Sequence, residues 1–231
     1  MPAVPALALS IERTSGGRLP ALWFVSCLLV AGLSSACGAK SEDPNDLPGP
    51  VVDPGPPPLG DGLPLPFVVD DHFHPSGCYA AEGCPVTIDT GCSERAEGAQ
   101  GQCYVFRFVE GQAFAGVFFQ NVDEVGAGNW GQAPGTTIVP GASAVTFYAA
   151  ASPAGQSVTF KVGGISDAEL AYKDSLNIEF VATLGSELEH FSIPLDGANY
   201  EQVLSAFSWH VVRLDGQAGP IDLILDDVRW E

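Results

Sequence analysis

Two pairs of adjacent aspartates have the clearest chemical potential in this chain. Asp70 and Asp71 follow an apolar run, and Asp226 and Asp227 lie within the last apolar run. If the first and last strands pair, these carboxylates converge, and they would repel one another without a cation between them. Calcium takes about six to eight oxygen ligands, so the sequence predicts a structural calcium site at all four residues. Alternatively, the aspartates accept backbone N–H bonds at strand ends.

Aromatic and amide side chains could bind a sugar. A sugar has an apolar C–H face and polar hydroxyls, so its site needs a flat apolar surface flanked by donors and acceptors. Trp130 follows Asn129 in a Gly/Pro-rich loop and could supply that surface, or it could plug the open end of the fold. Tyr148 is a second aromatic candidate, and Trp209 alternates with His210 so that at most one of the two faces the core. The predicted ligand-binding residues are Gln120, Asn129, Trp130, Tyr148 and Trp209.

Motifs for catalysis are scarce. The chain has no Gly-x-Ser-x-Gly, no His-Glu-x-x-His and no glycine-rich phosphate loop before a helix. His72 and His74 would share one side of an extended segment and could bind zinc or copper, but no third ligand is obvious nearby. We therefore predict a non-enzymatic protein. A polysaccharide-active enzyme is the weaker alternative, since opposed carboxylates cannot be recognised without coordinates.

The first 36 residues have the pattern of an export signal. Arg13 and Arg18 precede an apolar run over 21–33 that is too short to span a bilayer durably. Small residues then lead to Cys37, and this ending resembles the lipobox of bacterial lipoproteins, although Ser34 replaces the usual apolar residue. The resemblance implies that Cys37 is lipidated and holds the protein at the cell envelope, at the outer membrane or cell surface. An ordinary cleaved signal or a retained membrane anchor are the alternatives.

Residues 37–65 are rich in Pro, Gly and Asp and nearly lack large apolar side chains. Such a segment cannot bury enough surface to order itself, so we expect a disordered tether that leads to a folded domain at 66–231. The net charge of −19, with only nine Lys and Arg, opposes binding to nucleic acid or anionic lipid. Contact with a membrane is therefore expected through the lipid anchor alone. The oligomeric state is not predicted.

Closely spaced cysteines begin this domain. An even number of them in an exported chain favours disulfides over a zinc site, and four cysteines allow three pairings. We expect sequential pairing, Cys78 with Cys84 and Cys92 with Cys103, because both loops contain glycine and precede the regular strands.

Apolar residues alternate with polar ones along most of the domain. Residues 144–149 and 157–162 have the period of half-buried strands, and the turn over 152–155 suits a hairpin between them. Short strands without helical periodicity predict an all-β sandwich or barrel. Further strands are expected at 66–73, 104–109, 114–120, 176–182, 190–195, 206–213 and 221–230.

Short motifs along the whole domain occur in a familiar order. They are 70–73, 75–77, 115–117, 129–131, 145–148, 158–164, 174–175, 207–209 and 225–228. In this order they resemble a group of bacterial exported lipoproteins with galactose-binding-like jelly rolls, the sandwich of many carbohydrate-binding modules. The resemblance implies a jelly roll of about eight or nine strands and a glycan partner. Phe118 and Phe119 depart from it, because related proteins tend to carry Tyr-Trp there. The alternative is an envelope lipoprotein that contacts proteins or acts as a spacer, since this fold has many roles.

Overall fold

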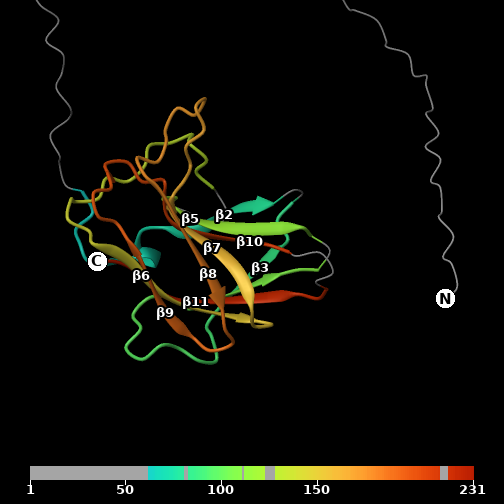
Figure 1. The fold of residues 1–231 in the computed structure, drawn as a ribbon. Coiled ribbons are helices and arrows are strands. Elements are labelled where there is room, and N and C mark those ends of the chain that lie inside the picture. The colour runs from blue at the N-terminus through green and yellow to red at the C-terminus, as the bar shows by residue number, and fades with distance from the viewer. Residues whose placement is uncertain (1–61, 81–82, 111, 123–127, 214–217) are drawn as a thin grey trace, which may run out of the picture. The chain divides into compact units, whose positions relative to one another are not determined.

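The computed structural model describes residues 62–80, 83–110, 112–122, 128–213 and 218–231, and nothing is described before residue 62. The predicted signal, Cys37 and most of the predicted tether therefore lie outside the described residues. Two antiparallel sheets face each other across one core (Figure 1), which confirms the all-β sandwich. No helix in the described part of the chain is long and apolar enough to cross a membrane.

One sheet contains the chain's last strand at its centre. Its strands, in spatial order, are β3 (Val86–Thr90), β4 (Tyr104–Phe108), β11 (Ile221–Trp230), β6 (Ala144–Ser152) and β9 (Glu189–Pro194), and β1 (Phe67–Val68) also pairs with β11. The other sheet has the order β2 (His74–Ala80), β5 (Phe114–Gln120), β10 (Ser205–Val212), β7 (Gln156–Gly163) and β8 (Asn177–Leu184). Most consecutive strands lie in opposite sheets, which is the wrapped connection of a jelly roll.

Alternating aromatic residues from both sheets form the core. The ring of Phe147 on β6 lies 4.6 Å from that of Phe160 on β7 and 4.9 Å from that of Phe207 on β10. Trp209 is also buried there, 5.2 Å from Phe106. Each such ring adds roughly 1.5–3 kcal/mol when it is removed from water, so these contacts hold the two sheets together.

The predicted hairpin at residues 152–155 is wrong. β6 pairs with β11 and β9, whereas β7 pairs with β10 and β8 in the other sheet. The turn therefore carries the chain from one sheet to the other. Alternation shows which face of a strand is buried, but it does not show which strand lies beside it.

The first predicted strand is shorter than expected. β1 ends at Val68, and a 3-10 turn over Val69–Asp71 follows, so neither Asp70 nor Asp71 lies on a strand. The expected pairing of first and last strands is confirmed, because Phe67 lies opposite Trp230 and their rings stack at 5.7 Å. β2 and β3 were not predicted.

The ordered packing begins ahead of residue 66. The N–H of Leu63 donates to the Thr137 carbonyl at 2.8 Å, and the Leu63 carbonyl accepts from Val139 N–H at 3.0 Å. Leu63 and Leu65 also pack against the core. These four residues of the predicted tether, 62–65, are described with the domain.

Both predicted disulfides are confirmed. Cys78 joins Cys84 across a sequence separation of 6, and Cys92 joins Cys103 across a separation of 11. The second bond closes the base of a loop over residues 92–103, which we call the disulfide loop.

Candidate functional site

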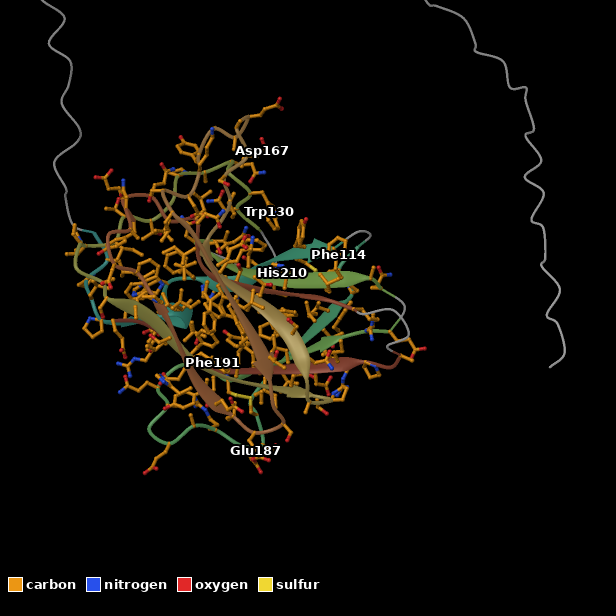
Figure 2. The ribbon with its side chains drawn as sticks, viewed as in Figure 1. Phe114, Trp130, Asp167, Glu187, Phe191 and His210 are labelled. Atoms are coloured by element: carbon orange, nitrogen blue, oxygen red, sulfur yellow. A yellow bond between two sulfur atoms is a disulfide. The ribbon has the colours of Figure 1, made fainter. Side chains whose placement is uncertain are left out.

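A groove of about 530 Å³ lies on the face of the β2-β5-β10-β7-β8 sheet that points away from the core. Figure 2 shows Trp130 between His210, on the sheet, and Asp167 in the loop that follows β7. The lining residues are Tyr79, Phe118, Trp130, Lys161, Gly164, Ile165, Ser166, Asp167, Leu170 and His210. They come from four strands and two loops, so the groove exists only in the folded sheet.

A glycine opens the floor of the groove. Gly116 on β5 lies opposite Tyr79 on β2 and His210 on β10. A Cβ atom there would lie 2.5 Å from the Trp209 carbonyl oxygen and 2.8 Å from the His210 Cβ. No side chain fits at this position, and the space between Tyr79 and His210 stays free.

Trp130 forms one wall of the groove. Its indole is partly buried and meets the Phe118 ring edge-on at 5.2 Å. The far end carries a second aromatic pair, Tyr79 and Phe114, with ring centroids 5.3 Å apart. Aromatic surface therefore borders the groove at both ends.

The side chain of Gln120, at the end of β5, holds the Trp130 loop in place. Its side chain is 0% exposed, its Nε2 donates to the Asn129 carbonyl at 3.1 Å, and its Oε1 accepts from Asn129 N–H at 3.0 Å. Glycines at 77 and 128 make room, since a Cβ at either would lie within 2.8 Å of the Gln120 amide oxygen. The structure thus corrects the prediction that Gln120 contacts a ligand, because the amide is fully enclosed.

Asn129 is also enclosed in the loop. Its Oδ1 accepts from the N–H groups of Gly131 and Ala133, each at 3.2 Å. Its Nδ2 donates to Asn121 Oδ1 at 3.0 Å and to the Ala133 carbonyl at 3.2 Å. The predicted ligand contact through Asn129 is corrected as well, because its hydrogen bonds shape the turn that presents Trp130.

Two other predicted ligand-binding residues lie elsewhere. Trp209 is 1% exposed in the core, so the structure corrects its predicted contact with a ligand. Tyr148 lies on β6 in the other sheet and does not line the groove. Its ring centroid lies 4.9 Å from that of His190. Of the five predicted residues, Trp130 alone is in the groove. The alternation of Trp209 with His210 could have predicted that His210 lines the groove, since a buried Trp209 places His210 on the outer face of the sheet.

Lys161 and His210 are the basic residues of the groove, and Asp167 is the carboxylate among its lining residues. Lys161 Nζ lies 2.5 Å from Glu179 Oε1, on adjacent strands, and this hydrogen bond lowers the pKa of Glu179. Burial, followed by the positive charge of Lys161, lowers the pKa of His210 below its usual range, while Glu179 opposes the shift. These effects favour the neutral imidazole, which can both donate and accept a hydrogen bond.

A buried carboxylate fixes the loop that forms the second wall. Asp174 accepts from the N–H groups of Ile165 at 2.8 Å, Leu204 at 2.6 Å and Ser205 at 3.2 Å. Burial raises the pKa of Asp174 to about 6, against the lowering effect of these three bonds. The wall and the start of β10 are thus joined through one side chain.

Three of the four predicted calcium ligands do converge, beneath the disulfide loop. Asp226 accepts from Arg95 Nη2 at 2.6 Å and from Ala96 N–H at 2.9 Å, while Asp227 accepts from Gln100 N–H at 3.0 Å and Gly101 N–H at 3.1 Å. Asp70 accepts from Gln102 N–H at 2.7 Å and the Tyr104 hydroxyl at 2.8 Å. The alternative expectation, aspartates that accept backbone N–H bonds, describes these contacts.

Asp71 does not join this cluster. It is exposed and borders a separate hollow of about 390 Å³ together with His72 and Arg229. Within the described ranges, no group of three or more His, Cys, Asp or Glu side chains is arranged to hold a metal ion, and this includes His72 and His74. Calcium binding stays a prediction that a chelator experiment can test.

The chain matches no protein-family model and no curated protein. Several solved structures are similar in their strand arrangement. One is the family 30 carbohydrate-binding module of cellulosomal cellulase Cel9D-Cel44B of Clostridium thermocellum, with 10% identity, a TM-score of 0.43, and 69% of this chain and 92% of that chain covered. Another is the family 11 module of the cellulosomal cellulase Lic26A-Cel5E of the same organism, with 12% identity, a TM-score of 0.36, and 69% and 86% covered. A family 29 module complexed with cellulohexaose has 10% identity, a TM-score of 0.37, and 71% and 89% covered.

Proposed function

We propose that this domain binds a carbohydrate chain in the groove between Trp130 and the β2-β5-β10-β7-β8 sheet. The observation that carries the proposal is the combination of aromatic rings with the imidazole of His210 and the paired Lys161 in one groove. Trp130, Phe118 and Tyr79 offer apolar surface to the C–H faces of a sugar, and neutral His210 can bond its hydroxyls. Charge plays a small part, because Lys161 is already paired with Glu179.

The carboxylates of the groove support binding rather than hydrolysis. Most glycoside hydrolases need two carboxyl groups across the scissile bond, one of them an acid whose pKa is raised. Glu179 is the carboxylate beside the floor, and its hydrogen bond with Lys161 lowers its pKa. Asp167, in the exposed wall, accepts the N–H of Glu169 at 3.1 Å. We infer a non-catalytic module.

We further propose that the mature protein is a lipoprotein at the bacterial cell surface, attached through Cys37 and carried on the tether that follows. The small residues between the apolar run and Cys37 support this proposal. Mass spectrometry of the mature N-terminus should show an acylated Cys37. A mature chain that starts at another residue would contradict it.

Substitution of Trp130 tests the carbohydrate proposal. In a glycan array or a pull-down with insoluble polysaccharide, Trp130→Ala should bind at least roughly tenfold more weakly than the wild type, a loss of about 1.4 kcal/mol. Tyr148→Ala is the matched control, because Tyr148 is also a partly buried aromatic side chain but belongs to the other sheet. Its binding should be unchanged.

A protein partner is the second candidate. Tyr79, Val181 and Val212 are exposed apolar side chains on strands of the groove sheet. Exposed apolar side chains also occur at protein contacts. If neither the wild type nor the control retains any glycan, the carbohydrate proposal fails and this second candidate is favoured.

A further inference from the structure

The disulfide loop packs against three carboxylates, of which Asp226 pairs with Arg95 at 2.6 Å and Asp227 lies 4.0 Å from Arg229. Asp226 and Asp227 lie at an irregularity in β11, where the register with β6 shifts and Asp227 has a φ of 51°. Asp226 is completely buried, and Asp70 reaches the same loop from the 3-10 turn. A carboxylate as far from water as that of Asp226 requires positive charge or N–H donors.

Arg95 supplies the positive charge from within the loop. Its guanidinium contacts Asp226 through Nη2 at 2.6 Å and through Nε at 3.2 Å. Nη2 also donates to the carbonyl of Gly101, on the far side of the same loop. One side chain thus joins both arms of the loop to β11, which the planar fork of an arginine can do and a lysine ammonium cannot do in the same geometry.

Backbone N–H groups and the Tyr104 hydroxyl bond most of the remaining oxygens, and Asp227 Oδ2 lies 4.0 Å from Arg229 Nη1. Asp226 Oδ2 accepts from Ala96, Asp227 Oδ1 accepts from both Gln100 and Gly101, and both oxygens of Asp70 are bonded. The loop also lies so close to Asp70 that a residue larger than glycine at position 101 would crowd it, because a Cβ there would lie 3.0 Å from Asp70 Oδ2. A calcium ion needs about six or more free oxygens, so these carboxylates as folded do not fit one.

We propose that Arg95 takes the place that a bound cation would hold, and that the domain is therefore stable without a divalent metal. The guanidinium is the resident counter-ion of the Asp226 carboxylate, and it ties the disulfide loop to the last strand. This inference is independent of the groove, so failure of the carbohydrate proposal would not affect it. It replaces the calcium ion that the aspartate pairs alone suggested.

Thermal unfolding of the full chain in detergent tests this proposal. The wild type should unfold at the same temperature, within about 1 °C, in EDTA and in excess Ca²⁺, because a ligand changes the midpoint only if it binds the native state. Arg95→Met keeps the length of the side chain but removes its charge. It should lower the midpoint by at least about 5 °C, since it leaves a buried carboxylate without its partner.

Two further variants separate charge from packing. Arg95→Lys restores the charge without the fork, so its midpoint should lie between those of the wild type and Arg95→Met. Arg107→Met is the matched control, because Arg107 also pairs with an aspartate, Asp222 at 2.8 Å, but the side chain of Asp222 is 27% exposed whereas that of Asp226 is buried. Its midpoint should fall by less than about 2 °C.

Either of two results would overturn the proposal. A wild-type midpoint that falls in EDTA and returns with Ca²⁺ would show that a metal, and not Arg95, balances the aspartates. An Arg95→Met midpoint equal to that of the wild type would show that the guanidinium is not needed. The first measurement uses the wild type alone, so it remains decisive even if the variants do not fold.

Discussion

Two loops of this domain are fixed by opposite kinds of chemistry. The Trp130 loop is held by the neutral amides of Gln120 and Asn129, whereas the disulfide loop is held by charged aspartates, Arg95 and a disulfide. The neutral loop borders the groove, where a fixed charge would attract counter-ions and hold water that a sugar must displace. The charged loop packs against the last strand and forms no part of the groove. The comparison indicates that ionic contacts hold the disulfide loop, while neutral amides hold the loop that presents Trp130.

Removal of Gln120 should have the largest effect on the neutral loop. Gln120→Ala leaves the N–H and C=O of Asn129 without partners in a buried place, which should lower the free energy of unfolding by about 3 kcal/mol. It should also weaken glycan binding, because Trp130 loses its fixed position. Chemical denaturation and a glycan pull-down measure the two effects.

The matched control for this variant is Gln102→Ala. Gln102 is an exposed residue of the charged loop whose amide donates to the Cys103 carbonyl at 3.3 Å. Its loss should change stability by less than about 0.5 kcal/mol and leave binding intact. If Gln120→Ala keeps full glycan affinity in its folded fraction, Gln120 does not position Trp130.

The same two loops show what the sequence could and could not provide. The even number of cysteines and the glycine-containing loops before the regular strands predicted the disulfides, which the structure confirms. The convergence of Asp70 with Asp226 followed from pairing of the first and last strands, which the structure confirms. Arg95 was not predicted to join them, because nothing in the sequence brings a loop residue next to a strand 131 positions away.

The groove was harder to predict than the fold. Alternation placed β5 and β7 nearly residue for residue, yet a groove across several strands depends on which strands are neighbours. Lys161 looked like an ordinary solvent-facing residue until β10 placed His210 near it. Gln120 and Asn129 are amides predicted to contact a ligand, but Gly77 and Gly128 allow the chain to close over the Gln120 side chain. Residue type alone does not distinguish an amide that binds a ligand from one that shapes a turn.

The wall of the groove near Asp174 provides a pH-dependent comparison. Burial raises the pKa of Asp174 to about 6 from its ordinary 3.8, so the ionised form is disfavoured in the folded state. The protonated form therefore adds stability that is fully present below the ordinary pKa and is lost as the pH rises through about 6. Between pH 7 and pH 5 the free energy of unfolding should rise by about 1 kcal/mol, which raises the midpoint by roughly 2–4 °C.

Calorimetry of the wild type and Asp174→Asn at both pH values measures this difference. Burial also raises the pKa of Asp70, which adds a change of the same sign in both proteins. The relevant quantity is therefore the difference between their slopes. Equal slopes would show that Asp174 does not titrate in this range and that its three N–H donors keep it ionised.

The smallest expected effect is that of salt on glycan binding. If the groove recognises sugars through aromatic rings and neutral His210, the affinity should change less than about twofold between 0.1 M and 1 M salt, although the Debye length falls from about 10 Å to 3 Å over this range. A site that used the acidic surface of this chain, with its net charge of −19, would respond strongly over the same range. Isothermal titration at the two salt concentrations measures the change. A loss of tenfold or more would mean that charge contributes to recognition, and the proposed division between an ionic structural loop and a groove that binds through aromatic rings and His210 would no longer hold.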